Sequence, residues 1–387
     1  MHDLRIRPFT IRIPEVAISD LRERLARTRW PDEYAGGGWD LGTDRTYLRS
    51  LTAHWSGTFD WRARETQLNR LPQFLASIGD LDVHFVHLRS ESPRAFPLLI
   101  THGWPGSFAE MTRLIPMLVD PAGFGHDPAD AFDVVVPSLP GFGFSSRPQR
   151  PGVTPRAIAE LWATLMRGLG YRRYGVQGGD FGASISAWLA RLHPESVARL
   201  HLNMMPFSLK KSPGYQAAHP LSERERQFFA DGASFAEREG GYSHIQRTKP
   251  QTLAYGLNDS PAGLAAWIVE KFRTWSDCGG DVESVFTRDE LLTNISIYWF
   301  TGTIGSSVRL YRESLAAPMH FDDDERVVPQ LGFAAFPKEL VTPPREWAER
   351  FFDVARWTEM PRGGHFAALE QPELLAEDLR AFFREIR

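Results

Sequence analysis

The first 80 residues combine short amphipathic stretches with frequent breaks in the chain. Apolar side chains recur at helical spacing in two stretches: Ile18, Leu21 and Leu25, then Leu48, Leu51 and Trp55. Breaks follow at Trp30-Pro31-Asp32, at the three glycines 36–38 and at Pro72. Such short helices bury too little surface to fold alone, so we predict that residues 1–80 wrap around another part of the protein.

The pattern changes at residue 81, where short apolar runs begin to alternate with helical repeats. The runs at 81–88, 96–100 and 132–136 are rich in Val, Ile and Leu. Such runs are typical of strands in a mainly parallel sheet with both faces covered. Helical repeats follow at 156–170 and 183–194. This alternation predicts an α/β fold, with a mostly parallel central sheet flanked by helices.

A largely helical, aromatic stretch interrupts this pattern from residue 206 to residue 321. Strand-like runs return at 326–337 and 354–360, and apolar positions at 375, 379 and 382 indicate a closing helix. A helical insertion in such a fold lies over the carboxyl edge of the sheet, so we interpret this stretch as a lid. The predicted order is a wrapping segment, a first core part, the lid and a second core part: 1–80, 81–205, 206–321 and 322–387.

Composition and charge exclude several classes of protein. Of the 387 residues, 42% are hydrophobic and 24% are charged, which is too apolar for a disordered chain. A net charge of −4 gives no electrostatic reason to expect nucleic acid as a partner. The N-terminus has no apolar run long enough for a signal peptide or a spanning helix. The single cysteine, Cys278, fits a reducing compartment. We therefore expect a soluble cytoplasmic protein without a membrane anchor, and leave a homodimer open.

The strongest local signal is Gly-Gly-Asp-Phe-Gly at 178–182, between a strand-like run and a helical repeat. It resembles the nucleophile elbow of α/β-hydrolases, with Asp180 where many members have serine. The elbow raises its central side chain above the sheet, and the helix N-terminus stabilises an anion there. Taken alone, the pattern fits equally well an aspartate that caps a helix.

A second motif, His-Gly-Trp-Pro-Gly at 102–106, follows the strand-like run at 96–100. In α/β-hydrolases the loop at this point donates one backbone N–H to the oxyanion hole, and the residue after the nucleophile donates another. The donors predicted here are the amides of Trp104 and Phe181. A simple Gly/Pro turn would explain the composition of this motif but not its position in the chain.

A catalytic base is expected late in the chain, at His365 in Gly-Gly-His-Phe. A lone histidine is more often structural, but the order of the three motifs favours the catalytic role. The acid that orients it should follow a strand, as Glu339 does. Asp353 precedes the last strand-like run and is the weaker candidate. The acidic run 322–325 also precedes a strand and is predicted to be a solvated surface run.

Together these motifs resemble the epoxide hydrolases of the microsomal and juvenile-hormone type, over nearly the whole chain. The matching blocks are Arg-Trp-Pro-Asp at 29–32, His-Gly-Trp-Pro-Gly-Ser at 102–107, Gly-Gly-Asp-Phe-Gly at 178–182, Leu-Asn-Met at 202–204, Gly-Tyr-Ser-His-Ile-Gln at 241–246, Leu-Asn-Asp-Ser-Pro at 257–261, Tyr-Trp at 298–299 and Gly-Gly-His-Phe-Ala-Ala at 363–368. The resemblance implies an α/β-hydrolase fold with a helical lid, and a small apolar epoxide and water as substrates. Membrane-bound relatives carry an N-terminal anchor, which we do not expect here.

The resemblance also implies a role for each site residue. Asp180 is the nucleophile, His365 the base and Glu339 its partner, and the lid tyrosines Tyr242 and Tyr311 hold the epoxide oxygen. A carboxylate forms an ester that water can cleave, whereas serine would leave an ether. The alkoxide released by ring opening needs donors, which tyrosine hydroxyls supply.

Aromatic residues of the lid are further candidates for the site. We expect an apolar substrate cavity that includes Trp104, Trp267 and Trp299, whereas some of the other lid aromatics are ordinary core. Tyr298 also lies in the lid and is the residue most easily mistaken for one of the catalytic pair.

Two other functions remain as alternatives. A haloalkane dehalogenase shares the fold, the aspartate and the histidine, but commonly has a tryptophan after the nucleophile as a halide donor. Phe181 has no ring N–H for this purpose. A catalytically silent ligand receptor would not need a base beside a nucleophile. The sequence contains no metal-ligand spacing, P-loop or complete dinucleotide motif, so we expect no metal and no cofactor.

Overall fold

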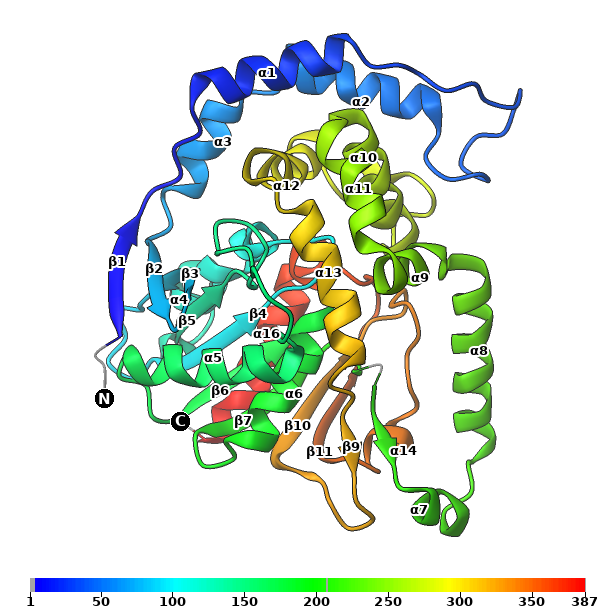
Figure 1. The fold of residues 1–387 in the computed structure, drawn as a ribbon. Coiled ribbons are helices and arrows are strands. Elements are labelled where there is room, and N and C mark those ends of the chain that lie inside the picture. The colour runs from blue at the N-terminus through cyan, green and yellow to red at the C-terminus, as the bar shows by residue number, and fades with distance from the viewer. Residues whose placement is uncertain (1–3, 207, 387) are drawn as a thin grey trace.

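The computed structural model describes residues 4–206 and 208–386, which form a central sheet, covering helices and a helical layer above one edge (Figure 1). Within these residues nine strands form one sheet in the order β1-β2-β3-β5-β4-β6-β7-β10-β11. Their bounds are β1 Arg5–Phe9, β2 Gln73–Ile78, β3 Leu81–Leu88, β4 Phe96–Thr101, β5 Phe132–Pro137, β6 Tyr174–Gly178, β7 Val197–Leu202, β10 Val327–Ala335 and β11 Phe352–Glu359. From β5 to β11 neighbouring strands are parallel, whereas β1, β2, β3 and β5 pair antiparallel.

Helices cover both faces of the parallel strands, which is why those strands are apolar runs rather than alternating ones. Helices α4 (Leu114–Val119) and α16 (Pro372–Phe383) pack together on one face (Figure 1). On the other face α5 (Pro155–Gly168) packs against α6 (Asp180–Leu192). Two short helices, α14 (Arg345–Ala348) and α15 (Ala367–Glu370), complete the second core part. The α/β prediction is therefore confirmed.

The N-terminal segment wraps around the molecule, with helices α1 (Glu15–Ala26), α2 (Arg45–Gly57) and α3 (Trp61–Leu68). The two helical stripes read from the sequence are buried as expected. Figure 1 shows α1 and α2 lying over the helical layer, and both contact its helix α11. The strands β1 and β2 were not predicted. Because β1 pairs only with β2, it is an edge strand, where Pro8 and charged side chains are tolerated.

The stretch predicted as a lid is mostly helical. Its helices are α7 Pro213–Ala218, α8 Glu223–Glu239, α9 Gly241–Thr248, α10 Pro250–Asp259, α11 Pro261–Trp275, α12 Arg288–Thr301 and α13 Ile304–Leu315. Two-residue strands, β8 (Lys210–Lys211) and β9 (His320–Phe321), pair with each other at its two ends. The paired strands bring both connections to the core close together, while α8 stands at the outer side (Figure 1).

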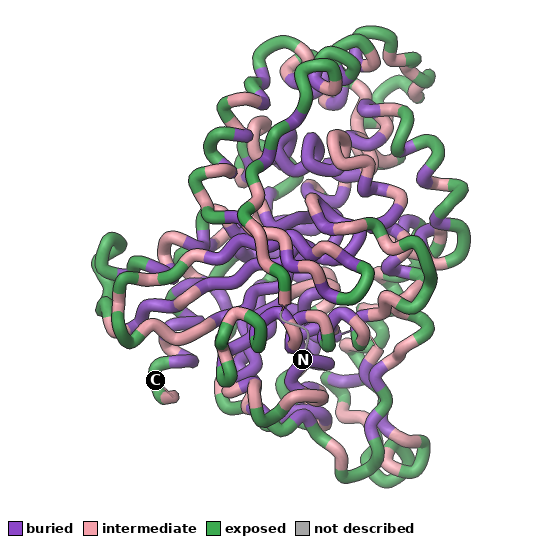
Figure 2. The backbone as a smooth tube through the Cα atoms, turned by 60° about the vertical axis from the view of Figure 1, so that its left-hand side comes forward, coloured by how far each residue is buried: buried purple, intermediate pink, exposed green. Residues whose placement is uncertain are grey.

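Buried residues form one continuous core that runs through the sheet and into the helical layer (Figure 2). Across the residues described, no helix has the length and apolarity needed to cross a membrane.

Candidate active site

Asp180 lies at the sharp turn between β6 and α6. Its φ of 49° is the only positive value at a non-glycine residue in the described chain. A Cβ on Gly178 would collide with the backbone of Gly182, and a Cβ on Gly182 would collide with the carbonyl of Thr101. The helix N-cap is Gly179, so Asp180 does not cap the helix. The strained backbone and the two close approaches are those of a nucleophile elbow.

The Asp180 carboxylate is held by backbone amides. The amide of Trp104 donates to its Oδ1 at 2.8 Å. A Cβ on Gly103 would collide with the Asp180 side chain, so a glycine is needed beside this hydrogen bond. Burial raises the pKa of Asp180, while the charge of His365 and the amides of Trp104 and Phe181 lower it. The two predicted amide donors therefore act on this carboxyl group.

His365 reaches the same site from a glycine-containing loop after β11. Gly363 has a φ of 104°, and the amide of His365 donates to the carbonyl of Trp275 at 2.9 Å. Its Nδ1 lies 2.7 Å from Oε1 of Glu339, and its Nε2 lies 3.6 Å from Oδ2 of Asp180. Burial lowers the pKa of His365, but the charge and hydrogen bond of Glu339 outweigh it and raise the pKa to about 9.

Glu339 follows β10, and its Oε1 also accepts a hydrogen bond from the Leu340 amide at 2.7 Å. The competing Asp353 lies in β11, is exposed and accepts a hydrogen bond from Gln330 at 3.2 Å. In the acidic run 322–325, residues 322–324 are exposed as expected, whereas Glu325 is only partly exposed and forms an ion pair with Arg191 at 2.6 Å. The structure therefore brings Glu339, and not Asp353, to His365.

The two predicted tyrosines lie together, with nearly perpendicular rings, on the wall of a cavity that Asp180 also lines. Tyr242 in α9 and Tyr311 in α13 are both buried, with ring centroids 5.9 Å apart. Each ring lies 5.6 Å from the Trp104 ring. The hydroxyl of Tyr298, by contrast, donates to the carbonyl of Gly106 at 2.7 Å.

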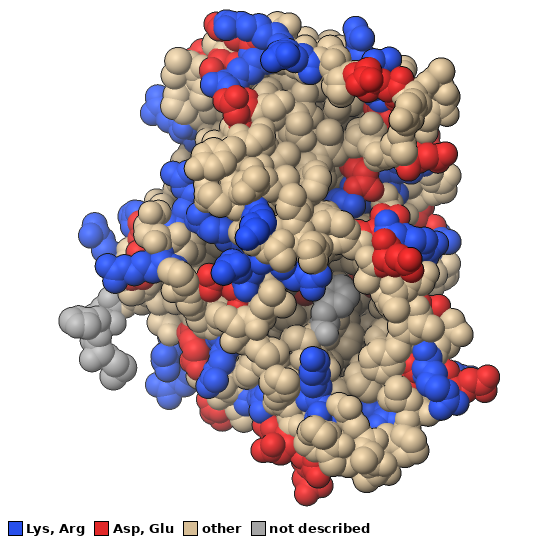
Figure 3. Space-filling model, turned by 45° about the vertical axis from the view of Figure 1, so that its right-hand side comes forward, with Lys and Arg blue, Asp and Glu red and all other residues tan. Residues whose placement is uncertain are grey.

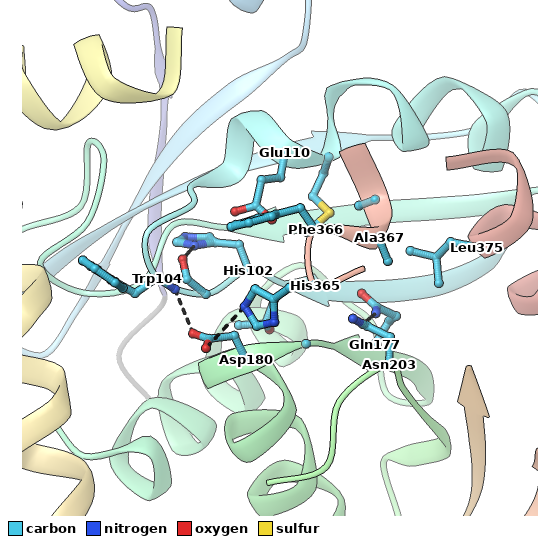
Figure 4. Close-up of a pocket in the computed structure, with 15 residues that line it drawn as sticks. His102, Trp104, Glu110, Gln177, Asp180, Asn203, His365, Phe366, Ala367 and Leu375 are labelled. Carbon is cyan, nitrogen blue, oxygen red and sulfur yellow. Dashed lines mark hydrogen bonds and ion pairs between the residues drawn. The ribbon is translucent and has the colours of Figure 1, made fainter. Parts of the chain in front are cut away.

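Two cavities meet at this site. The larger, about 1220 Å³, is lined by Asp180, Phe181, Tyr242 and Tyr311 and continues beneath α8. The smaller, about 30 Å³, is lined by Asp180, Trp104 and His365 (Figure 4). Among the described residues, Asp180 is the one that lines both. The carboxylate thus separates a wide cavity with tyrosines from a narrow one with the histidine.

Two of the tryptophans expected at the substrate cavity lie elsewhere. The indole of Trp267 donates to Gln246 at 2.9 Å, and the Arg24 guanidinium covers the ring of Trp299 at 5.8 Å. Neither lines either of the two cavities at Asp180. Both rings are only partly buried, and Trp299 is turned toward α1 of the wrapping segment. Trp104 lies at the site, where its ring stacks on Tyr242 at 8°, but it lines the smaller cavity and not the larger one.

Comparison with known proteins identifies the family. Residues 6–111 match the family model described as epoxide hydrolase N terminus, and residues 97–244 match that of the alpha/beta hydrolase fold. Epoxide hydrolase 1 of Sus scrofa is 39% identical, over 98% of this chain and 89% of its own length. The chain belongs to the epoxide hydrolase family.

Solved structures of this family share the whole architecture. Juvenile hormone epoxide hydrolase from the silkworm Bombyx mori has a TM-score of 0.88 at 32% identity, covering 99% of this chain and 96% of its own. The Aspergillus niger epoxide hydrolase has a TM-score of 0.85 at 31% identity, covering 100% and 97%. The epoxide hydrolase resemblance seen in the sequence is confirmed.

Two acidic residues near the site were not found from the sequence. Glu110 lines the smaller cavity, where burial raises its pKa to about 8. Glu370 accepts hydrogen bonds from the amides of Asp277, Gly364 and Phe366, and thereby fixes the loop that carries His365. Glu110 stands in Phe-Ala-Glu-Met at 108–111 and Glu370 ends Phe-Ala-Ala-Leu-Glu at 366–370, and these apolar neighbours are the one signal that could have indicated burial. In the described part of the chain no cluster of three or more acidic, histidine or cysteine side chains could hold a metal ion.

Proposed function

We propose that this protein adds water to an epoxide and releases a vicinal diol, through a covalent ester on Asp180. The position of Asp180 between the two cavities carries the proposal. One oxygen of a carboxylate can attack an epoxide that enters from the tyrosine side. The resulting ester can then be attacked by water from the histidine side.

In the first half-reaction, an Asp180 oxygen forms a bond to an epoxide carbon while the ring C–O bond breaks. Burial raises the pKa of Tyr242 and Tyr311, and the charge of Asp180 raises it further, so both hydroxyls are protonated donors at the start. They stabilise the alkoxide oxygen as it forms, and one of them supplies its proton. Esterification removes the Asp180 charge, which makes the tyrosines better acids at the moment of proton transfer.

In the second half-reaction, water attacks the carbonyl carbon of the ester and gives a proton to Nε2 of His365. The charge on the carbonyl oxygen is stabilised by the amides of Trp104 and Phe181. The bond between the carbonyl carbon and the substrate oxygen then breaks, and His365 returns the proton to that oxygen. The Glu339 carboxylate stabilises the positive imidazole between these steps.

The charge of Asp180 controls when His365 can act as a base. In the free enzyme the charges of Glu339 and Asp180 keep the histidine protonated, with a pKa of about 9. Alkylation removes the negative charge of Asp180, so the pKa of His365 falls. His365 therefore loses its proton and becomes able to act as a base only after the ester has formed.

The larger cavity favours an apolar epoxide. Its lining is mainly aromatic and aliphatic, and includes Trp188, Leu209, Phe228, Phe229, Phe235 and Trp347. Lining positions from Phe228 to Glu237 of α8 span roughly 14 Å at about 1.5 Å per residue. We therefore extend the expected substrates from small epoxides to longer apolar ones. Acidic and basic side chains are interspersed on the face in Figure 3, so that face offers no single-sign surface for a highly charged partner.

Other functions fit these side chains less well. A dehalogenase would need a halide donor where the ring of Phe181 has none. A silent receptor would not need His365 and Glu339 aligned on a carboxylate. The expected cytoplasmic location and the homodimer stay predictions that solution measurements would have to test.

The direct test is an activity screen over aromatic and aliphatic epoxides, with diol formation followed by mass spectrometry. Haloalkanes of matched size test the dehalogenase alternative through halide release. We expect diol from at least one apolar epoxide and none from Asp180→Asn. Halide release without diol formation would overturn the proposal, as would binding of epoxides without turnover.

A further inference from the structure

Polar and charged side chains form much of the wall of the smaller cavity. Gln177, Asn203 and Glu110 line it together with Asp180 and His365. Figure 4 shows Gln177 and Asn203 beside His365, on the side away from Asp180 and Trp104. The tyrosines and the apolar lining of the larger cavity are absent from its wall. Met111, Phe366 and Leu375 also line it, but its polar side chains and its volume of about 30 Å³ suit a water molecule better than an apolar substrate.

Gln177 lacks one hydrogen bond that its burial demands. It lies in β6, three residues before Asp180, and is 2% exposed. Its Nε2 donates to Oδ1 of Asn203 at 2.8 Å, while its Oε1 is buried and has no partner among the described residues. An unsatisfied buried carbonyl costs on the order of 1–3 kcal/mol, so such groups nearly always bind another protein group or an ordered water.

The volume of the cavity fits this need. A closed polar cavity holds a water molecule when it offers more than about 10–15 Å³ and two or more hydrogen-bonding partners. The space of about 30 Å³ meets the first condition, and Gln177, His365 and Asp180 on its wall meet the second.

We propose that this cavity binds the water that cleaves the ester, and that the side-chain carbonyl of Gln177 positions it. The inference rests on the function proposed above. One hydrogen of the water points to Oε1 of Gln177 and the other to Nε2 of His365. The water oxygen then faces the carbonyl carbon of the Asp180 ester. During attack the second hydrogen of the water moves to His365 as a proton. The first hydrogen stays on the water oxygen and remains hydrogen-bonded to Gln177, which keeps the water oriented.

This arrangement also explains why two cavities exist. An apolar epoxide that fills the larger cavity expels water from it, yet the second half-reaction needs water at once. A molecule held on the other side of Asp180 is not displaced by the substrate. Gln177 is thus a positioning residue for hydrolysis and has no part in ring opening.

Separate measurement of the two half-reactions tests the proposal. Wild-type protein and Gln177→Met are mixed with an excess of epoxide, and the ester is followed by intact-protein mass over time. We expect alkylation at the wild-type rate and ester hydrolysis slower by about tenfold or more, as for the loss of one hydrogen bond in the transition state. The ester of Gln177→Met should accumulate where that of the wild type does not.

The matched control is Gln73→Met, since Gln73 is also a buried glutamine in the same sheet, in β2. It lines neither cavity and should leave the ratio of the two rates unchanged. Ala368→Val narrows the smaller cavity without touching Gln177, and serves as the second variant should Gln177→Met fold poorly. It should slow hydrolysis selectively as well.

Ester hydrolysis at the wild-type rate in a folded Gln177→Met or Ala368→Val protein would overturn the inference. Failure of the proposed function gives a different result. In that case wild-type protein and His365→Gln would form no ester at all, whatever happens to the Gln177 variant.

Discussion

Nε2 of His365 lies 3.6 Å from Oδ2 of Asp180. This distance is too long for a hydrogen bond but short enough for a strong interaction between charges in a buried site. The histidine is thus held close to Asp180 without being bonded to it. Its protonation responds to the charge of Asp180, and space remains for a water molecule to approach.

The first prediction concerns the pH dependence of ester hydrolysis. The pKa of His365 is about 9 in the free enzyme, and esterification removes the Asp180 charge that helps to raise it. The rate of ester hydrolysis should therefore rise with pH to a plateau, with a midpoint below 9. Rapid mixing followed by decay of the preformed ester at a series of pH values measures it. A midpoint at or above the pKa of about 9 for His365 in the free enzyme would show that the charge of Asp180 does not raise this pKa.

His365→Gln should trap the ester, because alkylation needs no base but hydrolysis does. The intact mass should rise by the mass of the epoxide and stay raised. Glu339→Gln should slow hydrolysis less severely, since the imidazole loses the stabilisation of its cation but keeps a neighbour. Asp353→Asn is the control and should behave as wild type. Consumption of epoxide by His365→Gln without an adduct would show that the base is misassigned.

Removal of one tyrosine hydroxyl should slow ring opening by about 10²–10³, by analogy with the loss of one oxyanion donor. Tyr242→Phe and Tyr311→Phe should each retain some activity, and the double variant should retain almost none. Hydrolysis of the ester should be nearly unchanged, since the hydroxyls face the epoxide oxygen. Stopped-flow measurement of the alkylation step separates the two effects.

Tyr298→Phe is the matched control for the tyrosine pair. It removes the hydrogen bond to the Gly106 carbonyl, so it should lower the free energy of unfolding by about 1–3 kcal/mol. Its alkylation rate should change far less than that of the other variants. A Tyr298→Phe protein with a hundredfold slower alkylation would mean that the wrong tyrosine had been assigned.

Glu110 should make the fold less stable as the pH rises. Burial raises its pKa from 4.5 to about 8. Between these values the unfolded chain has lost this proton while the folded protein keeps it, so the free energy of unfolding falls as the pH rises. Glu110→Gln should flatten the slope between about pH 4.5 and pH 8 in urea unfolding. The exposed Glu91→Gln is the control, and an equal slope in both variants would reject the effect.

The elbow, the oxyanion loop and the histidine loop could be predicted from the sequence because their geometry is local. Gly178 is required by the close backbone of Gly182, and Gly182 is required by the close carbonyl of Thr101 in the neighbouring strand β4. The order of the motifs along the chain then indicates the fold. Glu339 could be predicted because it follows a strand at the edge where the site forms.

The remaining features depend on contacts between distant segments. The edge strand β1 exists only because β2 lies beside it, and its five residues carry too weak a pattern to be recognised alone. Positions 291–298 of α12 are all buried, so helical periodicity cannot tell which aromatic side chain points toward the cavity. For this reason the sequence could not indicate that Trp299 lies outside the two cavities. Glu110 is enclosed by residues that are distant in the sequence, so the apolar residues beside it gave only a weak signal of its raised pKa.

A single turnover in ¹⁸O-labelled water, with protein in excess over epoxide, distinguishes attack on the epoxide by Asp180 from attack by water. If Asp180 attacks, the label enters the Asp180 carboxylate, where peptide mass spectrometry detects it, while the first diol carries only unlabelled oxygen. Labelled diol in the first turnover, with Asp180 unlabelled, would contradict attack by Asp180.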